Sequence, residues 1–295
     1  MASDRPARLK VGVLGCGRVG AVLGAALAEA GHRVVAVSGV SEASRDRARA
    51  LLPGVPMLLP EEVLDRSELV LLTPPAAVLE SLVGHLCVSG AFRPGQIVVH
   101  THPGFGIRVL SEARHVLPLA IHPATRFTGT RSDLARLRVS HAAVTAHPDR
   151  RAVAEALAVE MGAEPVWVEE AARCVYAATI SLIGDHVHAL FEAGRSHALE
   201  AGIRDAEDLL RGYLHASAEV AHTRRAHPHG FAETGDAEGL TRDLTALAGA
   251  QPDPRPSYRA LARLAVAGSL RSGTPIELRD DSLFDALSQD DGGGG

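Results

Sequence analysis

The chain has 295 residues, of which 46% are hydrophobic and 3% aromatic, and its net charge is −5. This length suits one large domain or two ordinary ones, with a core built mainly of alanine, valine and leucine. The acidic balance and the lack of a basic run exclude nucleic acid as the expected partner. We find no apolar stretch of about 18–20 residues and no signal peptide, so we expect a soluble, cytoplasmic protein.

Up to residue 168, segments with the pattern of buried strands alternate with segments that have the period of helices. Alternation of this kind predicts an α/β fold with a doubly wound parallel sheet. The expected strands span 9–15, 32–39, 68–74, 96–102, 116–123, 138–146 and 164–168, and the expected helices span 18–31, 41–52, 76–87, 107–114 and 149–162.

From residue 169 onward the sequence predicts helices and no strands. The expected helices span 170–202, 205–226, 236–249 and 257–273. We therefore expect a first domain over 1–168 and an all-α second domain over 169–288. Residues 289–295, an acidic and glycine-only end, are expected to be a disordered tail.

The first predicted strand and helix are joined by a glycine motif, Gly15-Cys16-Gly17-Arg18-Val19-Gly20. In a G-x-G-x-x-G sequence the first glycine makes a tight turn. The second lets the backbone approach a pyrophosphate, and the third lets the helix pack on the strand. The helix N-terminus offers free N–H groups to the phosphate. The motif predicts a dinucleotide site that includes Arg18 and Val19, and the alternative is a glycine turn that binds no nucleotide.

The end of the second predicted strand bears on the choice of dinucleotide. NAD enzymes usually place an acidic residue there, but this chain has Val37-Ser38-Gly39-Val40-Ser41, followed by Ser44, Arg45 and Arg47. Hydroxyl groups and arginines suit a 2′-phosphate, so we expect NADP to be bound by Ser38, Ser41, Arg45 and Arg18. The alternative is that Ser41 caps its helix and the arginines are solvated.

Three further strand ends carry polar residues or proline. Thr73-Pro74 ends the strand at 68–74, His100-Thr101-His102 ends the next strand, and His122 lies at the end of the strand after that. Ligands bind at the carboxyl ends of parallel strands, so we expect Thr73, Pro74 and His100 to contact the cofactor. His102 and His122 are candidate proton donors, because histidine exchanges protons near neutral pH. For each histidine the alternative is a purely structural role.

The chain resembles a known family in several of these motifs. Besides the glycine motif, "VVAVSG", "LVLLTPP", "PGQIVVHT" and "HPATRFTG" are similar to Rossmann-like NADP oxidoreductases with a helical C-terminal domain of unknown function. These proteins are distant relatives of ketopantoate reductase, pyrroline-5-carboxylate reductase and 6-phosphogluconate dehydrogenase. The resemblance implies a Rossmann domain, a 6-phosphogluconate dehydrogenase-like helical domain and an active site in the cleft between them. The chain departs from the family at His102-Pro103, where members have Ser-Gly, and at Asp185, where they have Asn.

The long helix over 170–202 has an apolar and a polar stripe. At 100° per residue, the apolar stripe is expected to face the core, and its members are Tyr176, Ile180, Ile183, Val187, Leu190 and Phe191. The polar stripe contains Ser181, Asp185, His188 and Glu192. The resemblance implies that Asp185 looks into the cleft, where it could orient His188 as a proton donor. The alternative is a solvated face.

These observations predict an NADPH-dependent reductase of a small carbonyl or imine substrate, such as a 2-oxo acid. The proton donor is expected among His122, His102, Asp185 and His188. Lys10, at the start of the first strand, is the only lysine, so a lysine-based mechanism does not transfer to this chain. The alternatives are a prephenate-type dehydrogenase and an NADP-binding protein without turnover. His100, His102, His122 and Asp185 could suit a metal, but their spacing is a weak signal and we expect none. Residues 257–270 could pair with a second copy, which predicts a homodimer.

Overall fold

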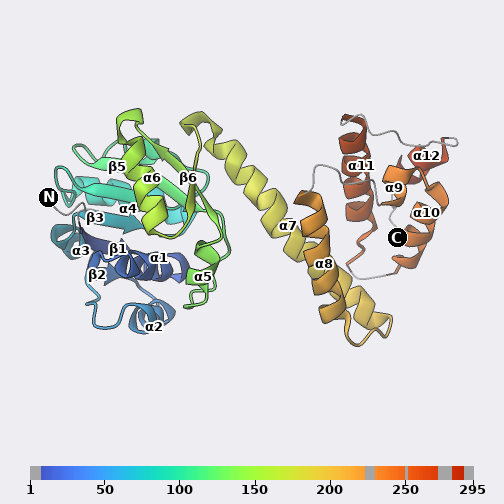
Figure 1. Ribbon diagram of the computed structural model, residues 1–295, viewed down its shortest axis with the longest axis horizontal. Coiled ribbons are helices and arrows are strands. Elements are labelled where there is room, and N and C mark those ends of the chain that lie inside the picture. Colours follow the sequence, from blue (N-terminus) through green and yellow to red (C-terminus); the bar gives the residue numbers. More distant parts are fainter. Residues whose placement is uncertain (1–7, 223–229, 250–251, 272–280, 289–295) are drawn as a thin grey trace, which may run out of the picture. The chain divides into compact units, whose positions relative to one another are not determined.

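The computed structural model describes residues 8–222, 230–249, 252–271 and 281–288. The chain forms two compact units, Met1–Ile183 and Gly184–Gly295, and we describe each by itself (Figure 1). Strands end at residue 167, next to the predicted domain boundary, but the first unit continues to Ile183 because the first turns of the next helix pack on its sheet. The predicted tail lies outside the described residues.

The first unit is built on a seven-stranded sheet with the order β2-β1-β3-β4-β5-β6-β7. The strands are β1 (Lys10–Leu14), β2 (Arg33–Ser38), β3 (Leu69–Leu72), β4 (Ile97–His100), β5 (Leu117–Pro123), β6 (His141–Ala146) and β7 (Glu164–Trp167). The fold class predicted from the sequence is confirmed. One detail was wrong: β6 pairs antiparallel with β5, while the other neighbours are parallel. The segment after β5 contains only the short helix α5 (Asp133–Leu137), and β6 starts beside the end of β5, where Ala124 N donates to His141 O at 2.7 Å.

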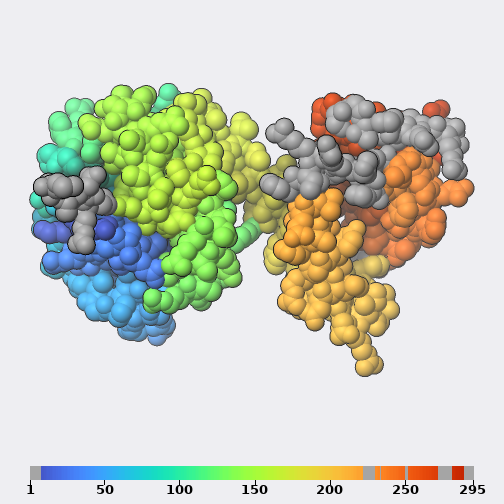
Figure 2. Space-filling view, in the orientation of Figure 1, coloured from blue at the N-terminus to red at the C-terminus, as the bar shows by residue number. Residues whose placement is uncertain are grey.

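Helices cover both faces of the sheet, which explains why β3 and the middle of β4 are continuous apolar runs. One face packs against α1 (Arg18–Glu29), α2 (Glu42–Leu51), α5 and α6 (Arg151–Glu160). The other packs against α3 (Pro60–Arg66), α4 (Ala76–Val88) and the 3-10 turn η1 (Ile107–Leu110). Figure 2 shows the atoms of the first unit, coloured from blue to yellow-green, packed together in one body. The helix expected over 107–114 is shorter than predicted, because only the 3-10 turn η1 forms there.

The apolar cluster on the sheet face covered by α3, α4 and η1 includes no residue of β5. Beyond it, polar side chains occupy the same face of the sheet. The strand residues of the cluster come from β1, β2, β3 and β4, and the last of them is Val98. Side chains alternate along strands, so His100 shares the face of Val98, and His122 lies opposite the face of Leu119 and Ile121. This part of the face is covered by the start of α7 (Arg173–Glu200), after the 3-10 turn η3 (Glu170–Ala172).

The second unit is helical throughout its described residues, as predicted. It contains α8 (Ala206–His222), α9 (Phe231–Thr234), α10 (Ala237–Ala246), α11 (Arg255–Arg271) and α12 (Ser282–Ser288). Its core is a small cluster of apolar side chains from α9 to α12, among them Leu240, Leu244, Val266 and Leu283. Leu261, Leu264 and Leu270 of α11 are exposed, so this helix uses only one of its faces in that core.

Two expectations about α7 were wrong. The stripe expected in the core is not buried, because Ile183 is 63% exposed and Leu190 is 44% exposed.

The second expectation was that the chain has no apolar stretch of membrane-spanning length. Yet among the described residues Glu170–Glu200 is one helix long and apolar enough to span a bilayer, with a mean hydropathy of 1.3. A single helix of this kind is weak evidence for a membrane span, because core helices of soluble proteins meet the same criteria of length and composition.

Candidate active site

The glycine motif forms a tight loop between β1 and α1. Gly15 has φ +93°, and a Cβ there would lie 2.8 Å from the carbonyl oxygen of Thr73. A Cβ at Gly20 would overlap the Gly15 carbonyl oxygen and the Thr73 hydroxyl. The loop is held by Ser38, whose carbonyl accepts from Gly15 N at 3.1 Å and Cys16 N at 2.7 Å. Two of the three glycines are thus required by the fold itself.

The N-terminus of α1 fits a phosphate group. Gly17 is its N-cap and makes no capping hydrogen bond through a side chain, and the first turn has no acidic residue. The nearest atom to a Cβ built on Gly17 is the Gly15 carbonyl oxygen, 3.9 Å away, so the space in front of this glycine is open. Uncapped N–H groups beside open space are the arrangement that a dinucleotide pyrophosphate needs.

Ser41 is partly occupied by a structural role. Its Oγ accepts from Ser44 N at 3.1 Å, so it caps α2, and it shares a hydrogen bond with Ser44 Oγ at 2.9 Å. Arg45, in the first turn of α2, lines a pocket of about 530 Å³, which Gly39 and Arg49 also line. The capping alternative is therefore correct for Ser41, and its contact with NADP, like that of Arg45, stays a prediction.

Arg18 and Arg47 converge on a loop that the sequence analysis did not assign to the cofactor. A Cβ built on Gly129, which has φ +83°, would lie 2.7 Å from Arg47 Nε and 3.0 Å from Arg18 Cγ. The loop is held by the buried Asp133, whose Oδ2 accepts from Thr128 N at 2.9 Å and Gly129 N at 2.8 Å. The "FTGTR" stretch after β5 could have signalled this turn, but only the fold brings it to α1 and α2.

His100 supports its loop from the inside. The residue is fully buried, and burial lowers the pKa of its imidazole to about 4, so the ring is neutral at pH 7. Its Nε2 donates to Gly106 O at 2.9 Å, and its Nδ1 accepts from His102 N at 3.3 Å. Both ring nitrogens are used within the loop. A contact between His100 and the cofactor remains a prediction, and the observed role of the side chain is to shape the loop.

Glu170 holds the same loop from the outside. Its carboxylate accepts from Ile107 N at 2.8 Å and Arg108 N at 3.2 Å, and a Cβ at Gly106 would overlap it. These bonds connect the loop after β4 to the start of α7, although 63 residues separate Ile107 from Glu170. Glu170 could not be recognised as a site residue in the sequence, because nothing local distinguishes it from a solvated glutamate.

His102 projects from this loop and is half-buried. Its Nδ1 accepts from Gly104 N at 3.2 Å, and its ring lies 4.8 Å from that of Phe105. Burial lowers the pKa of His102, which keeps the ring neutral near pH 7. Since Nδ1 acts as acceptor, the neutral ring carries its hydrogen on Nε2, where it can be donated.

His122 is hydrogen-bonded to Tyr176, with 2.7 Å between His122 Nδ1 and Tyr176 Oη. The two rings pack edge to face with 5.6 Å between their centres. Burial and the nearby Arg173 and His102 lower the pKa of His122 to about 4. Tyr176 was assigned to the apolar stripe of its helix; instead it is half-buried and brings the one hydroxyl of that stripe to His122. The single hydroxyl group in an otherwise apolar stripe was the available signal.

The remaining candidates lie elsewhere or lack support. Asp185 and His188 belong to the second unit and are exposed, so their role stays a prediction. Among the described residues, no group of three or more histidine, cysteine, aspartate or glutamate side chains could hold a metal ion.

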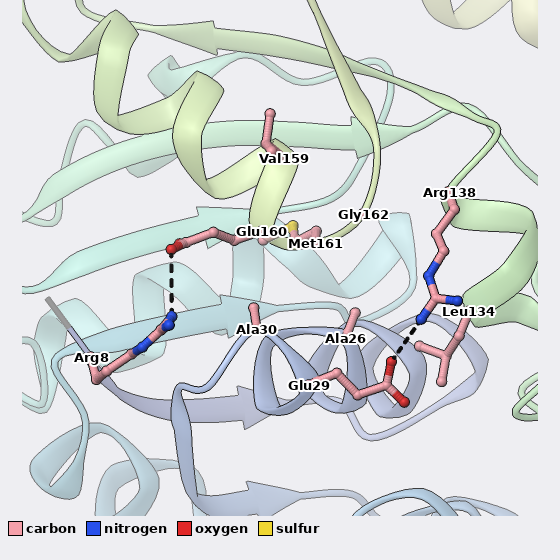
Figure 3. Close-up of a pocket in the computed structure, with 10 residues that line it drawn as sticks. All are labelled: Arg8, Ala26, Glu29, Ala30, Leu134, Arg138, Val159, Glu160, Met161 and Gly162. Atoms are coloured by element: carbon pink, nitrogen blue, oxygen red, sulfur yellow. Dashed lines mark hydrogen bonds and ion pairs between the residues drawn. The ribbon is translucent and has the colours of Figure 1, made fainter. Parts of the chain in front are cut away.

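A pocket of about 450 Å³ lies at the amino ends of the strands, away from these residues (Figure 3). Two ion pairs border it, Arg8–Glu160 at 3.9 Å and Arg138–Glu29 at 3.3 Å, above an apolar floor that includes Ala26 and Met161. Ligands of doubly wound sheets bind at the carboxyl edge instead. The glycine loop, Thr73, His102 and His122 all follow or end strands at that edge, which makes it the candidate active site.

Comparisons with known proteins agree with this architecture. Residues 1–123 match the Rossmann-like domain, and residues 140–265 match a domain of unknown function, DUF2520. None of the curated proteins matches the chain.

Solved structures share the fold over most of their length. BF3122 from Bacteroides fragilis, provisionally assigned as an NADP oxidoreductase, is 17% identical with a TM-score of 0.70, covering 88% of this chain and 98% of its own. An imine reductase from Pseudomonas sp. is 20% identical with a TM-score of 0.62, covering 95% and 100%. The 1-pyrroline-5-carboxylate reductase of Streptococcus pyogenes is 18% identical with a TM-score of 0.58, covering 96% and 99%. Identities this low establish the fold alone. The two domain matches together confirm the resemblance drawn from the sequence: a segment that matches a Rossmann-like domain is followed by one that matches DUF2520.

Proposed function

We propose that this protein is an NADPH-dependent reductase that transfers hydride to the carbonyl or imine carbon of a small substrate. The observation that carries the proposal is the Tyr176–His122 pair, which places a hydroxyl donor at the sheet edge that also holds the glycine loop. The NADP oxidoreductase assignment of BF3122 and the reductase names of two other structural neighbours are consistent with it.

The side chains at this edge can supply the proton that such a reduction requires. The nicotinamide, when bound, supplies the hydride. Tyr176 donates its hydroxyl proton to the substrate oxygen or nitrogen, and neutral His122 stabilises the phenolate that is left by a hydrogen bond from its Nδ1–H. His102 offers a second N–H, from Nε2, to orient the substrate. Lys10, the only lysine, opens β1 at the opposite edge, so it takes no part in the reaction.

The proposed cofactor is NADP rather than NAD. No acidic residue stands at the end of β2, and Arg18, Arg45 and Arg47 are the cations near that end and the glycine loop. A guanidinium group can donate two parallel hydrogen bonds to the oxygens of one phosphate, so these arginines favour a cofactor with a 2′-phosphate. We expect NADPH to bind at least tenfold more tightly than NADH, a difference of about 1.4 kcal/mol.

A fluorescence titration with NADPH and NADH, followed by turnover assays, tests the proposal. Candidate 2-oxo acids and cyclic imines would be screened by loss of NADPH absorbance. Tyr176→Phe should lose at least 100-fold in turnover, the usual size of a proton-transfer contribution, and keep its NADPH affinity. Tyr213→Phe, at a side chain that is 74% exposed, is the matched control. Failure to bind either dinucleotide would refute the proposal, and binding without turnover of any probe would favour a non-catalytic NADP-binding protein.

The protein is further proposed to act as a homodimer. Exposed apolar side chains on α7 and α11, such as Ile183 and Leu264, are typical of surfaces that pair with a second copy. Light scattering coupled to size exclusion would measure the mass directly.

A further inference from the structure

Arg173 is an unusual residue, a fully buried guanidinium that is bonded to no carboxylate among the described residues. It opens α7 and is 1% exposed. Its Nε donates to Thr145 Oγ1 at 2.7 Å, and its Nη2 donates to Ala120 O at 2.8 Å and Ala143 O at 3.2 Å. Its Nη1 is buried and has no hydrogen-bond partner in the structure. Burying a cation in this way is expensive, and three neutral acceptors satisfy only part of it.

The groups around Arg173 belong to the candidate active site. Its guanidinium carbon lies 5.9 Å from the ring centre of Tyr176, and its positive charge acts on His100 and His122. Glu170, in the turn before α7, interacts electrostatically with Arg173. Its carboxylate, however, already accepts hydrogen bonds from two backbone N–H groups. Burial lowers the pKa of Arg173 to about 10, which still leaves it charged at pH 7.

This charge affects the two partners in the direction that proton donation needs. A positive charge disfavours a proton on His122, which adds to burial in keeping that ring neutral. Burial raises the pKa of the Tyr176 hydroxyl, and the charge of Arg173 opposes that rise. When Tyr176 gives up its proton, the phenolate forms beside a fixed cation and a neutral imidazole N–H.

We propose that Arg173 is a positioning residue whose buried charge keeps His122 neutral and stabilises the phenolate that forms when Tyr176 protonates the substrate. Hydride forms the new C–H bond, the C=O or C=N double bond becomes single, and the Tyr176 proton forms the O–H or N–H bond. Water then returns a proton to Tyr176. The effect on His122 does not depend on the proposed function, whereas the effect on turnover rests on it.

Histidine ring titration by NMR tests the charge effect without any substrate. The His122 signal would be assigned by its loss in His122→Asn. In the wild type His122 should stay neutral down to about pH 4. In Arg173→Met its midpoint should rise by about one pH unit, and Arg173→Lys, which keeps the charge, should restore most of the wild-type value. An unchanged His122 midpoint in Arg173→Met would overturn the proposal.

His102 serves as the internal control for a purely structural role. Burial alone lowers its pKa, so its midpoint should stay constant in both variants. If His102 and His122 rise together in Arg173→Lys as well as Arg173→Met, the site has opened and Arg173 only holds it closed. That result would also overturn the proposal.

The tyrosine side of the proposal has its own readout. The chain has three tyrosines, so the tyrosinate absorbance step that is lost in Tyr176→Phe belongs to Tyr176. Its midpoint should rise in Arg173→Met and return in Arg173→Lys, and a midpoint that ignores the charge would contradict the proposal. If both titrations respond but no probe is reduced, the charge effect stands and the proposed function fails.

Discussion

Replacing Gly17 with alanine separates the dinucleotide site from the stability of the fold. A Cβ at Gly17 meets no atom closer than 3.9 Å, whereas one at Gly20 would overlap the Gly15 carbonyl oxygen and lie 2.9 Å from Val13 Cγ1. The two glycines of the motif therefore have different reasons to be glycine. Gly20 is required by the packing of α1 on β1, and Gly17 is required only if a ligand approaches its backbone.

The expected magnitudes follow from this difference. In Gly17→Ala, a poorer N-cap and a less flexible unfolded chain oppose each other, so the free energy of unfolding should change by less than about 1 kcal/mol. NADPH affinity should fall at least tenfold, or about 1.4 kcal/mol. Gly20→Ala should lower the free energy of unfolding by about 1–3 kcal/mol even without ligand, because its Cβ overpacks the core.

Denaturant unfolding of the ligand-free variants and a fluorescence titration with NADPH measure these two quantities. Gly84→Ala is the matched control, because Gly84 lies in α4 with no atom within 4 Å of its Cβ position. It should leave affinity unchanged and stabilise the helix by about 0.5–1 kcal/mol. Wild-type NADPH affinity in Gly17→Ala would refute the pyrophosphate assignment of this loop.

Three other predictions concern pH, the loop after β4 and assembly. As the pH falls from about 6.5 to about 4, the free energy of unfolding should decrease, because the unfolded chain takes up protons that buried His100 and His122 refuse in the fold; His122→Asn should weaken this dependence in urea titrations, and the part due to His100 should remain. Gly106→Ala should cost about 1–3 kcal/mol through overlap with Glu170, and Glu170→Ala should remove most of that penalty in a double-mutant cycle. Leu264→Asp should yield monomers in light scattering, whereas Val139→Asp, at another exposed apolar residue, should not; a dimer mass in both would contradict the interface.

The sequence determined the features whose physical cause is local. A glycine motif between an apolar strand and a helix allows one loop conformation, and the structure has it with Gly15 at positive φ. Strand and helix patterns alternate up to residue 168, and only helix patterns follow. This difference predicted the two kinds of domain, because the period of the apolar residues shows which faces of each element are buried. The capping role of Ser41 could also be anticipated, since an N-cap depends only on the next three residues.

Tertiary structure alone decided what surrounds the candidate active site. Tyr176 lies 54 residues from His122, and Glu170 lies 63 residues from Ile107, so no local pattern could pair them. In a helical wheel Tyr176 counts as apolar, because the wheel shows the direction of a side chain and not what it meets. In the sequence, nothing distinguishes Arg173 from a solvent-exposed arginine. Its burial arises because α7 starts across β5 and β6, whose antiparallel pairing presents the carbonyl groups that accept its hydrogen bonds.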